Sequence, residues 1–174
     1  MLMLAACASA PTHYFALPVQ PARAPRVRLR VGAVAVAPIV MPPGYGRLPL
    51  SYAGTGSAVH VARHARWIAP LGTLMRLTLA RDMAARVLPS SAVRMPGQSL
   101  DADTAIVRVI VQRFLPDGHG RVLLRARWSL KGPRDDQGVV RLAVKTPAGY
   151  PSETRAMGLA VARLARRICD AMRA

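Results

Sequence analysis

The histidines His60 and His64 are the residues whose spacing comes nearest to a metal site. On a helix, side chains four residues apart share one face and can bind a metal together. A zinc protease would carry glutamate directly after the first histidine, where Val61 stands, and no third ligand is apparent. We therefore expect no bound metal and no cofactor at these histidines.

The acidic and hydroxyl side chains also lack the partners that catalysis needs. Asp101 and Asp103 lead into a predicted strand and are interpreted as loop or capping residues. Ser57 lies in the glycine-rich segment GTGSAV, which lacks the Gly-Lys-Ser/Thr ending of a phosphate-binding loop. The patterns GxSxG and GxGxxG do not occur. The sequence predicts no catalytic residues, and therefore a protein that is not an enzyme and works by binding.

Cys7 is the residue whose neighbours do match a known chemistry. The segment Leu4-Ala5-Ala6-Cys7 has the pattern at which bacterial lipoprotein signals end. Small residues before the cysteine fit the signal peptidase, and the thiol accepts a diacylglyceryl group, which forms a thioether. Cleavage would leave Cys7 as a mature N-terminus carrying fatty acids such as palmitate. Position 8 is alanine and not aspartate, so nothing here indicates retention in the inner membrane.

The segment before Cys7 is short for a signal peptide, which needs a basic region and an apolar stretch of about 7 to 15 residues. Either the start codon lies further upstream or the cysteine is an ordinary one, and we expect the first. Residues 1–7 would then be a truncated signal with its lipidation site. Residues 8–25 are rich in proline and are predicted to be a flexible tether. Residues 26–174 would form the domain.

Charge is the most unusual property of the composition. Lysine and arginine number 25 against 8 acidic residues, a formal net charge of +17. The basic residues are spread from Arg23 to Arg173 and are not gathered in one arm, which argues against nucleic acid as the partner. Such a surface attracts anions such as phospholipid headgroups, lipid A phosphates or an acidic partner. No apolar run reaches the roughly 18 to 20 residues that a transmembrane helix needs.

Hydrophobic periodicity predicts the elements that would carry these residues. A strand begins at Arg26, and a loop from Met41 holds a short strand near Arg47 to Tyr52. A helix over 71–88 follows the landmarks Trp67, Pro70 and Leu71. Three alternating strands and a final helix with Ser152 as its N-cap complete the chain. Cys169 is predicted to be a small buried hydrophobic residue of that helix.

This order of elements predicts an α/β fold with a single domain. Its mixed sheet would contain an antiparallel three-stranded meander, packed by two main amphipathic helices. The loop from Pro42 to Gly56 is uncharged except for Arg47 and exposes two tyrosines. It is therefore the best candidate for partner contact, with Tyr45, Arg47 and Tyr52 as the binding residues.

Several segments in this order resemble the PqiC-like lipoproteins, the auxiliary lipoprotein components of MCE-type ABC transport systems in Gram-negative envelopes. The matching segments, which cover nearly the whole chain, are LAACASAPTHYFALP, VGAVAVAP, RWIAPLGTLMRLTLARDMAARVL, ADTAIVRVIVQRF, RVLLRARWSLKG and GLAVARLARRICDAM.

The resemblance implies a lipoprotein anchored by its N-terminal lipid to the periplasmic face of the outer membrane. It would be a non-catalytic accessory subunit of a lipid transport system that supports membrane integrity, with an MCE-domain protein as partner. The resemblance is also compatible with phospholipid contact and with a homo-oligomeric ring. The alternatives are a structural outer-membrane lipoprotein that aids envelope or peptidoglycan assembly and, less favoured, a basic nucleic-acid-binding protein.

Overall fold

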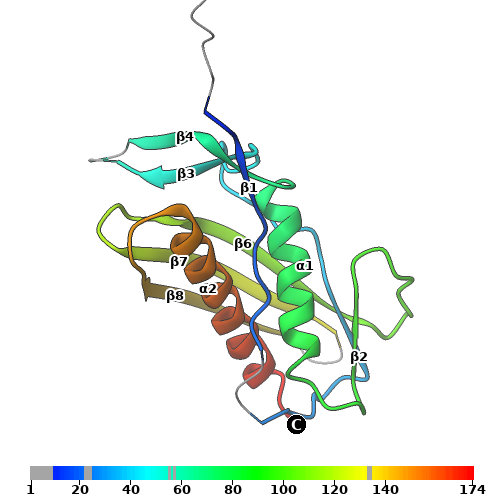
Figure 1. The fold of residues 1–174 in the computed structure, drawn as a ribbon. Helices are drawn as coiled ribbons and strands as arrows, with labels where there is room; N and C mark the ends of the chain where they lie inside the picture. Colours follow the sequence, from blue (N-terminus) through cyan, green and yellow to red (C-terminus); the bar gives the residue numbers. More distant parts are fainter. Residues whose placement is uncertain (1–9, 22–24, 55, 57, 133–134) are drawn as a thin grey trace, which may run out of the picture.

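A five-stranded mixed sheet forms the centre of the molecule, with strand order β5-β2-β6-β7-β8 (Figure 1). The computed structural model describes residues 10–174 apart from 22–24, 55, 57 and 133–134. The bounds of the five strands are β2 Ala33–Val36, β5 Ala92–Arg94, β6 Ala105–Pro116, β7 Arg121–Lys131 and β8 Asp136–Lys145. The last three run antiparallel, while β2 pairs in parallel with β5 and with β6.

The predicted fold class is confirmed by this sheet and by the helices that pack on it. Strands β6, β7 and β8 are the expected three-stranded meander, and their apolar residues alternate with exposed ones. Because successive side chains of a strand point to opposite faces, this alternation gives the sheet one buried face and one face open to solvent. The strand expected to begin at Arg26 is regular only from Ala33, as β2, and it is buried along its whole length.

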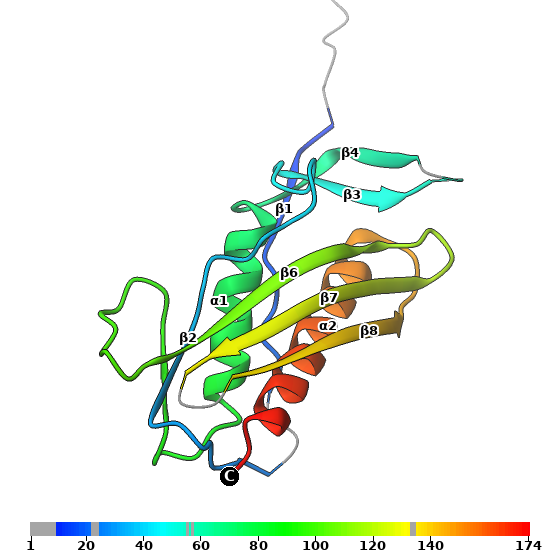
Figure 2. The same ribbon diagram turned by 180° about the vertical axis from the view of Figure 1, so that it is seen from behind.

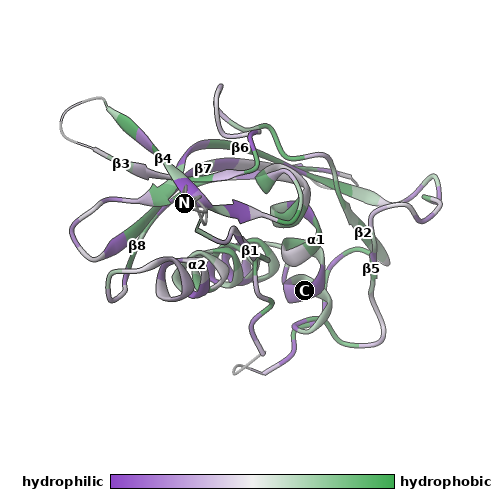
Figure 3. Ribbon diagram, turned by 45° about the horizontal axis from the view of Figure 1, so that its top comes forward, coloured by the Kyte–Doolittle hydropathy of each residue, from purple (hydrophilic) through white to green (hydrophobic). Residues whose placement is uncertain are grey.

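Helices α1 (Leu71–Ala84) and α2 (Tyr150–Ala171) lie side by side on the buried face of the sheet (Figures 1 and 2). Helix α2 carries both hydrophilic and hydrophobic residues around its circumference (Figure 3). Its N-cap is Gly149 at φ 111°, so the prediction of Ser152 was wrong by one turn. Glycine adopts this backbone conformation at little cost, which lets the chain turn sharply from the sheet into the helix.

A second, three-stranded sheet with order β1-β4-β3 stands at one end of the domain (Figure 1). Its strands are β1 His13–Phe15, β3 Pro49–Ala53 and β4 Val59–Trp67. Strand β3 spans nearly the same residues as the short strand predicted near Arg47 to Tyr52. Strand β4 contains His60 and His64, whose spacing could hold a metal only on a helix. In a strand, residues four positions apart are separated by roughly 13 Å, too far for the two imidazoles to share a metal.

Residues 13–20 differ from the flexible tether that the prolines suggested, and we call them the strap. Strand β1 pairs in parallel with β4, and Leu17 is only 5% exposed. The hydroxyl of Thr78 donates a hydrogen bond to the carbonyl of Leu17 at 3.0 Å. The backbone N–H of Gln20 donates to a carboxylate oxygen of Asp82, also at 3.0 Å. The packed domain therefore begins near His13 and not at residue 26.

Candidate functional site

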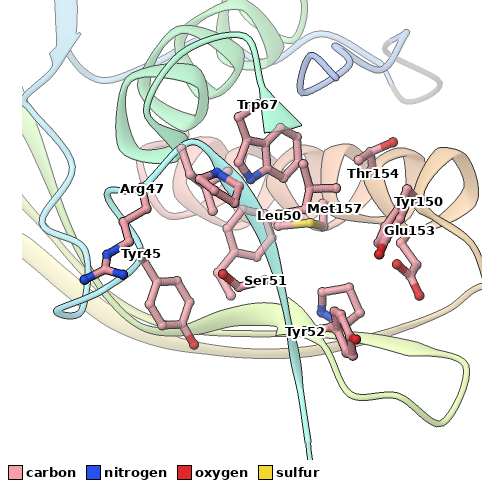
Figure 4. A pocket seen from close by; sticks show the side chains of 14 residues that line it. Tyr45, Arg47, Leu50, Ser51, Tyr52, Trp67, Tyr150, Glu153, Thr154 and Met157 are labelled. Atoms are coloured by element: carbon pink, nitrogen blue, oxygen red, sulfur yellow. The ribbon is translucent and has the colours of Figure 1, made fainter. Parts of the chain in front are cut away.

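The three residues predicted to bind a partner line one narrow cavity (Figure 4). Tyr45, Arg47 and Tyr52 come from the loop before β3 and from β3 itself. The structural landmarks Trp67 and Leu71 line the same cavity. Its volume is about 20 Å³, space for about one water molecule, so it holds no larger ligand in this conformation.

Trp67, the last residue of β4, connects the segments at this end of the molecule. It is buried, and its backbone N–H donates to the carbonyl of Leu48 at 2.7 Å. The next amide, that of Ile68, donates to Phe15 of the strap at 3.0 Å. Pro70 is the N-cap of α1, whose first residue is Leu71, as predicted. The two hydrogen bonds therefore join the end of β4 to the segments on both sides of it, just before α1 begins.

Helix α2 forms the other side of the cavity, which the sequence analysis did not predict. Tyr150, Glu153 and Met157 project from its first two turns into the cavity wall (Figure 4). Their spacing of three and four residues places them on one helix face, which is the only signal that could have grouped them. What no pattern showed is that this face meets β3, whose residues are about a hundred positions earlier in the chain.

The cavity rim is aromatic and weakly polar. Burial raises the pKa of Tyr45, despite the nearby charge of Arg113. Burial likewise raises the pKa of Glu153, whose carboxyl group receives a hydrogen bond from the backbone of the helix start. Tyr52 stacks on His60 across the β3–β4 hairpin, with ring centroids 5.2 Å apart and planes 25° apart. These groups can make apolar contacts and hydrogen bonds with a partner.

A second, wider hollow lies beside the cavity at the start of α1. Its volume is about 540 Å³, and its wall is mostly apolar, with Pro38, Ile39, Met41 and Pro70 among its residues. The guanidinium of Arg76 also lines it and donates from Nε to the carbonyl of Val36 at 2.8 Å. Pro70 therefore faces this hollow and not the cavity that holds the other landmarks.

The cysteines and the other candidate ligands are placed as follows. Cys7 lies outside the described residues. Cys169 is 1% exposed, and burial raises the pKa of its thiol to about 12, as suits the predicted hydrophobic role. In the described part of the chain, no three histidine, cysteine, aspartate or glutamate side chains are grouped to hold a metal. Among the helices described there, none has the length and apolar character that crossing a membrane requires.

A comparison with protein families identifies the family to which this domain belongs. The model of the ABC-type transport auxiliary lipoprotein component matches residues 15–169. The chain belongs to this family. As an auxiliary lipoprotein of an ABC-type transport system, it is a membrane-anchored protein of the cell envelope. The match begins inside the strap, so the strap is part of the family's domain.

Solved structures show the same fold. The crystal structure of an uncharacterized protein superposes with a TM-score of 0.78 at 19% identity, covering 92% of this chain and 98% of the other. Protein XCC0632 from Xanthomonas campestris, of the family model DUF330, gives a TM-score of 0.66 at 15% identity, covering 90% and 92%. At these identities the likeness establishes the fold alone. No curated protein matches this auxiliary lipoprotein in sequence.

Proposed function

We propose that this auxiliary lipoprotein is a non-catalytic accessory subunit of an MCE-type lipid transport system. It would be anchored to the periplasmic face of the outer membrane by fatty acids on Cys7 and would support membrane integrity by docking an MCE-domain protein. The observation that carries the proposal is the family match over residues 15–169, joined to the lipidation pattern that ends at Cys7.

The position of the strap supports this form of attachment. The first described residues, 10–12, are exposed and lead into β1 at the end of the domain that carries the β3–β4 hairpin (Figure 1). A lipid on Cys7 would thus be only a few residues from the packed strap. The short connection would hold this end of the domain near the membrane to which the lipid belongs.

The cavity end of the molecule is the surface we assign to the MCE-domain partner. It presents Tyr45, Arg47 and Tyr52 on segments held by Trp67 and by the start of α2. Tyrosine and arginine are enriched where protein interfaces are strongest, because each offers a large contact area together with a polar group. The described residues of this surface contain no paired base and nucleophile, which favours docking over catalysis.

The anchor is tested by labelling cells with a palmitate analogue, with the gene at its natural locus so that any upstream codons are translated. Wild type and Cys169→Ser are expected to take up the label and to fractionate with the outer membrane. Cys7→Ser is expected to take up none and to leave the membrane fraction. A labelled Cys7→Ser protein, or an unlabelled wild type, would overturn the proposed anchor.

A further inference from the structure

The open face of the five-stranded sheet carries a dense set of basic side chains. Both described helices lie behind β6, β7 and β8 when the sheet is seen from this side (Figure 2). The exposed basic residues that point outward from these strands are Arg108, Arg113, Arg121, Arg125, Arg127, Lys131, Arg141 and Lys145. We call this set the basic face.

Three of these arginines lie in one row across neighbouring strands. The strand register pairs Arg113 of β6 with Arg125 of β7, and Arg125 with Arg141 of β8. Directly opposite residues have Cβ atoms about 5 Å apart, and like charges in such positions destabilise a sheet. The fold therefore bears a repulsion at this place that a bound anion would relieve.

Acidic side chains do not neutralise the row. The sequence has only 8 acidic residues, and the ion pairs between described residues leave Arg113, Arg125 and Arg141 out. Among the described residues, acidic side chains reach the basic face near its ends: Asp117 pairs with Arg121, and Asp135 pairs with Lys131. Asp136 lines a hollow with Arg108 at the same end as Asp135. The centre of the face keeps its positive charge.

Exposed aliphatic side chains border the arginine row. Arg127 stands between Ile110 and Val139 in the register, and Val40 is bridged to Ile110 on the other side. Ile110, Val139 and Val40 are 50%, 53% and 56% exposed. Basic residues beside exposed aliphatic ones are the combination that binds membrane surfaces, because the cations meet anionic headgroups while the apolar groups enter the headgroup boundary.

From this arrangement we propose that the basic face docks on an anionic phospholipid surface. A second copy of the chain is disfavoured as occupant, because two such faces would repel each other. An acidic protein would also pair with the arginines, but the exposed aliphatic side chains beside them fit the boundary of a headgroup layer better. The basic face adjoins the cavity end at Arg113, whose charge acts on Tyr45. A vesicle assay on the unacylated chain alone tests the contact without the anchor at Cys7 and without the partner protein.

The test measures co-sedimentation of the full unacylated chain, Cys7→Ser, with vesicles of phosphatidylcholine alone or mixed with phosphatidylglycerol. We expect binding only to the mixed vesicles, weakening as salt rises above about 0.1 M. Replacing the row by glutamine (Arg113→Gln, Arg125→Gln, Arg141→Gln) should weaken binding on the order of 100-fold. This variant should keep its melting temperature, since it loses like-charge repulsion.

The matched control removes an equal number of positive charges from the exposed side of α2, in the other layer of the domain. Its substitutions are Arg155→Gln, Arg163→Gln and Arg167→Gln. It should weaken binding by only a few-fold. Equal losses in the two variants would show that net charge alone attracts the protein, and would overturn the proposal. So would failure of the Cys7→Ser chain to bind phosphatidylglycerol, or row-dependent binding to polyglutamate without binding to vesicles. None of these outcomes bears on acylation at Cys7 or on the transporter partner.

Discussion

Pro18 of the strap packs against Gly158 of α2 so closely that no larger residue fits at position 158. A Cβ atom built there would lie 2.8 Å from Cγ of Pro18 and closer still to the Pro18 carbonyl oxygen. Real Cβ atoms do not approach other atoms so closely, and the backbone of the strap is the obstacle. The glycine is therefore the feature of α2 that lets the strap lie across the two helices.

Gly158→Ala should accordingly loosen the strap. Alanine is the better helix residue by about 1 kcal/mol, yet we expect a net loss of about 1 to 3 kcal/mol in the free energy of unfolding, because the clash outweighs propensity. Urea denaturation and proteolysis within residues 13–20 measure it. The control is Gly32→Ala, where nothing lies within 4 Å of the added atom and stability should change little. A more stable Gly158→Ala protein with an unchanged strap would contradict this packing.

Asp82 should make the strap sensitive to pH. Burial raises the pKa of its carboxyl group to about 6, although the Gln20 amide and Arg86 favour the charged form. A folded-state pKa above the unfolded value means that this group favours the folded state most below about pH 4. That contribution is lost as pH rises through about 6.

The neutral variant Asp82→Asn should remove most of this dependence. Between pH 4 and pH 7, we expect the free energy of unfolding of wild type to fall relative to the variant by about 1 to 2 kcal/mol, after allowance for solvent screening. Parallel urea titrations at several pH values provide the measurement. If the two proteins keep a constant difference across this range, Asp82 does not titrate as described.

Cys169 should be chemically inert in the folded protein. The thiolate is the reactive form, and a thiol that is 1% exposed with a pKa of about 12 supplies almost none at neutral pH. In the Cys7→Ser chain, a maleimide should add nothing under native conditions and one label per chain in denaturant, as read by mass spectrometry. Rapid native labelling would mean that the C-terminal part of α2 opens readily.

Tyr52 should matter more for docking than for stability. Its stacking on His60 and its half-buried position predict a cost of about 1 kcal/mol to the free energy of unfolding for Tyr52→Ala. If the cavity end docks the partner, the same change should weaken binding of the MCE-domain protein by about 30-fold, the size of an interface hot spot. Tyr14→Ala, at an exposed tyrosine that does not line the cavity, is the control in the same binding assay. Equal effects of the two variants would remove the cavity end from the interface.

Alternation along strands made the meander predictable. Val122, Leu124 and Trp128 face the core while Arg125 and Arg127 face solvent, as a period of two requires. The start of α1 was readable from Pro70 and Leu71. The end of α1 was harder to predict. The helix ends at Ala84, four residues before the expected position, although the apolar spacing continues to Val87.

Contacts between distant segments were not predictable from local pattern. Asp82 falls outside the apolar stripe of α1, yet it is buried, because the strap covers it and supplies a hydrogen bond from Gln20. The proline-rich composition of the strap resembles a linker, and the strap packs because of partners on other elements: Gly158, Thr78 and Asp82. Likewise, the loop residues Tyr45 and Tyr52 could be selected from sequence, whereas Tyr150 and Met157 could not.

The central claim is that the protein is an accessory subunit of an MCE-type transporter. It is tested most directly by isolating the acylated protein from cell envelopes in mild detergent and identifying the proteins that co-purify with it. We predict that an MCE-domain protein co-purifies with wild type and is depleted with Tyr52→Ala, while Tyr14→Ala retains it. Recovery of peptidoglycan-building proteins, with no MCE-domain protein from either the wild type or the control, would contradict the account. That result would favour the structural lipoprotein instead.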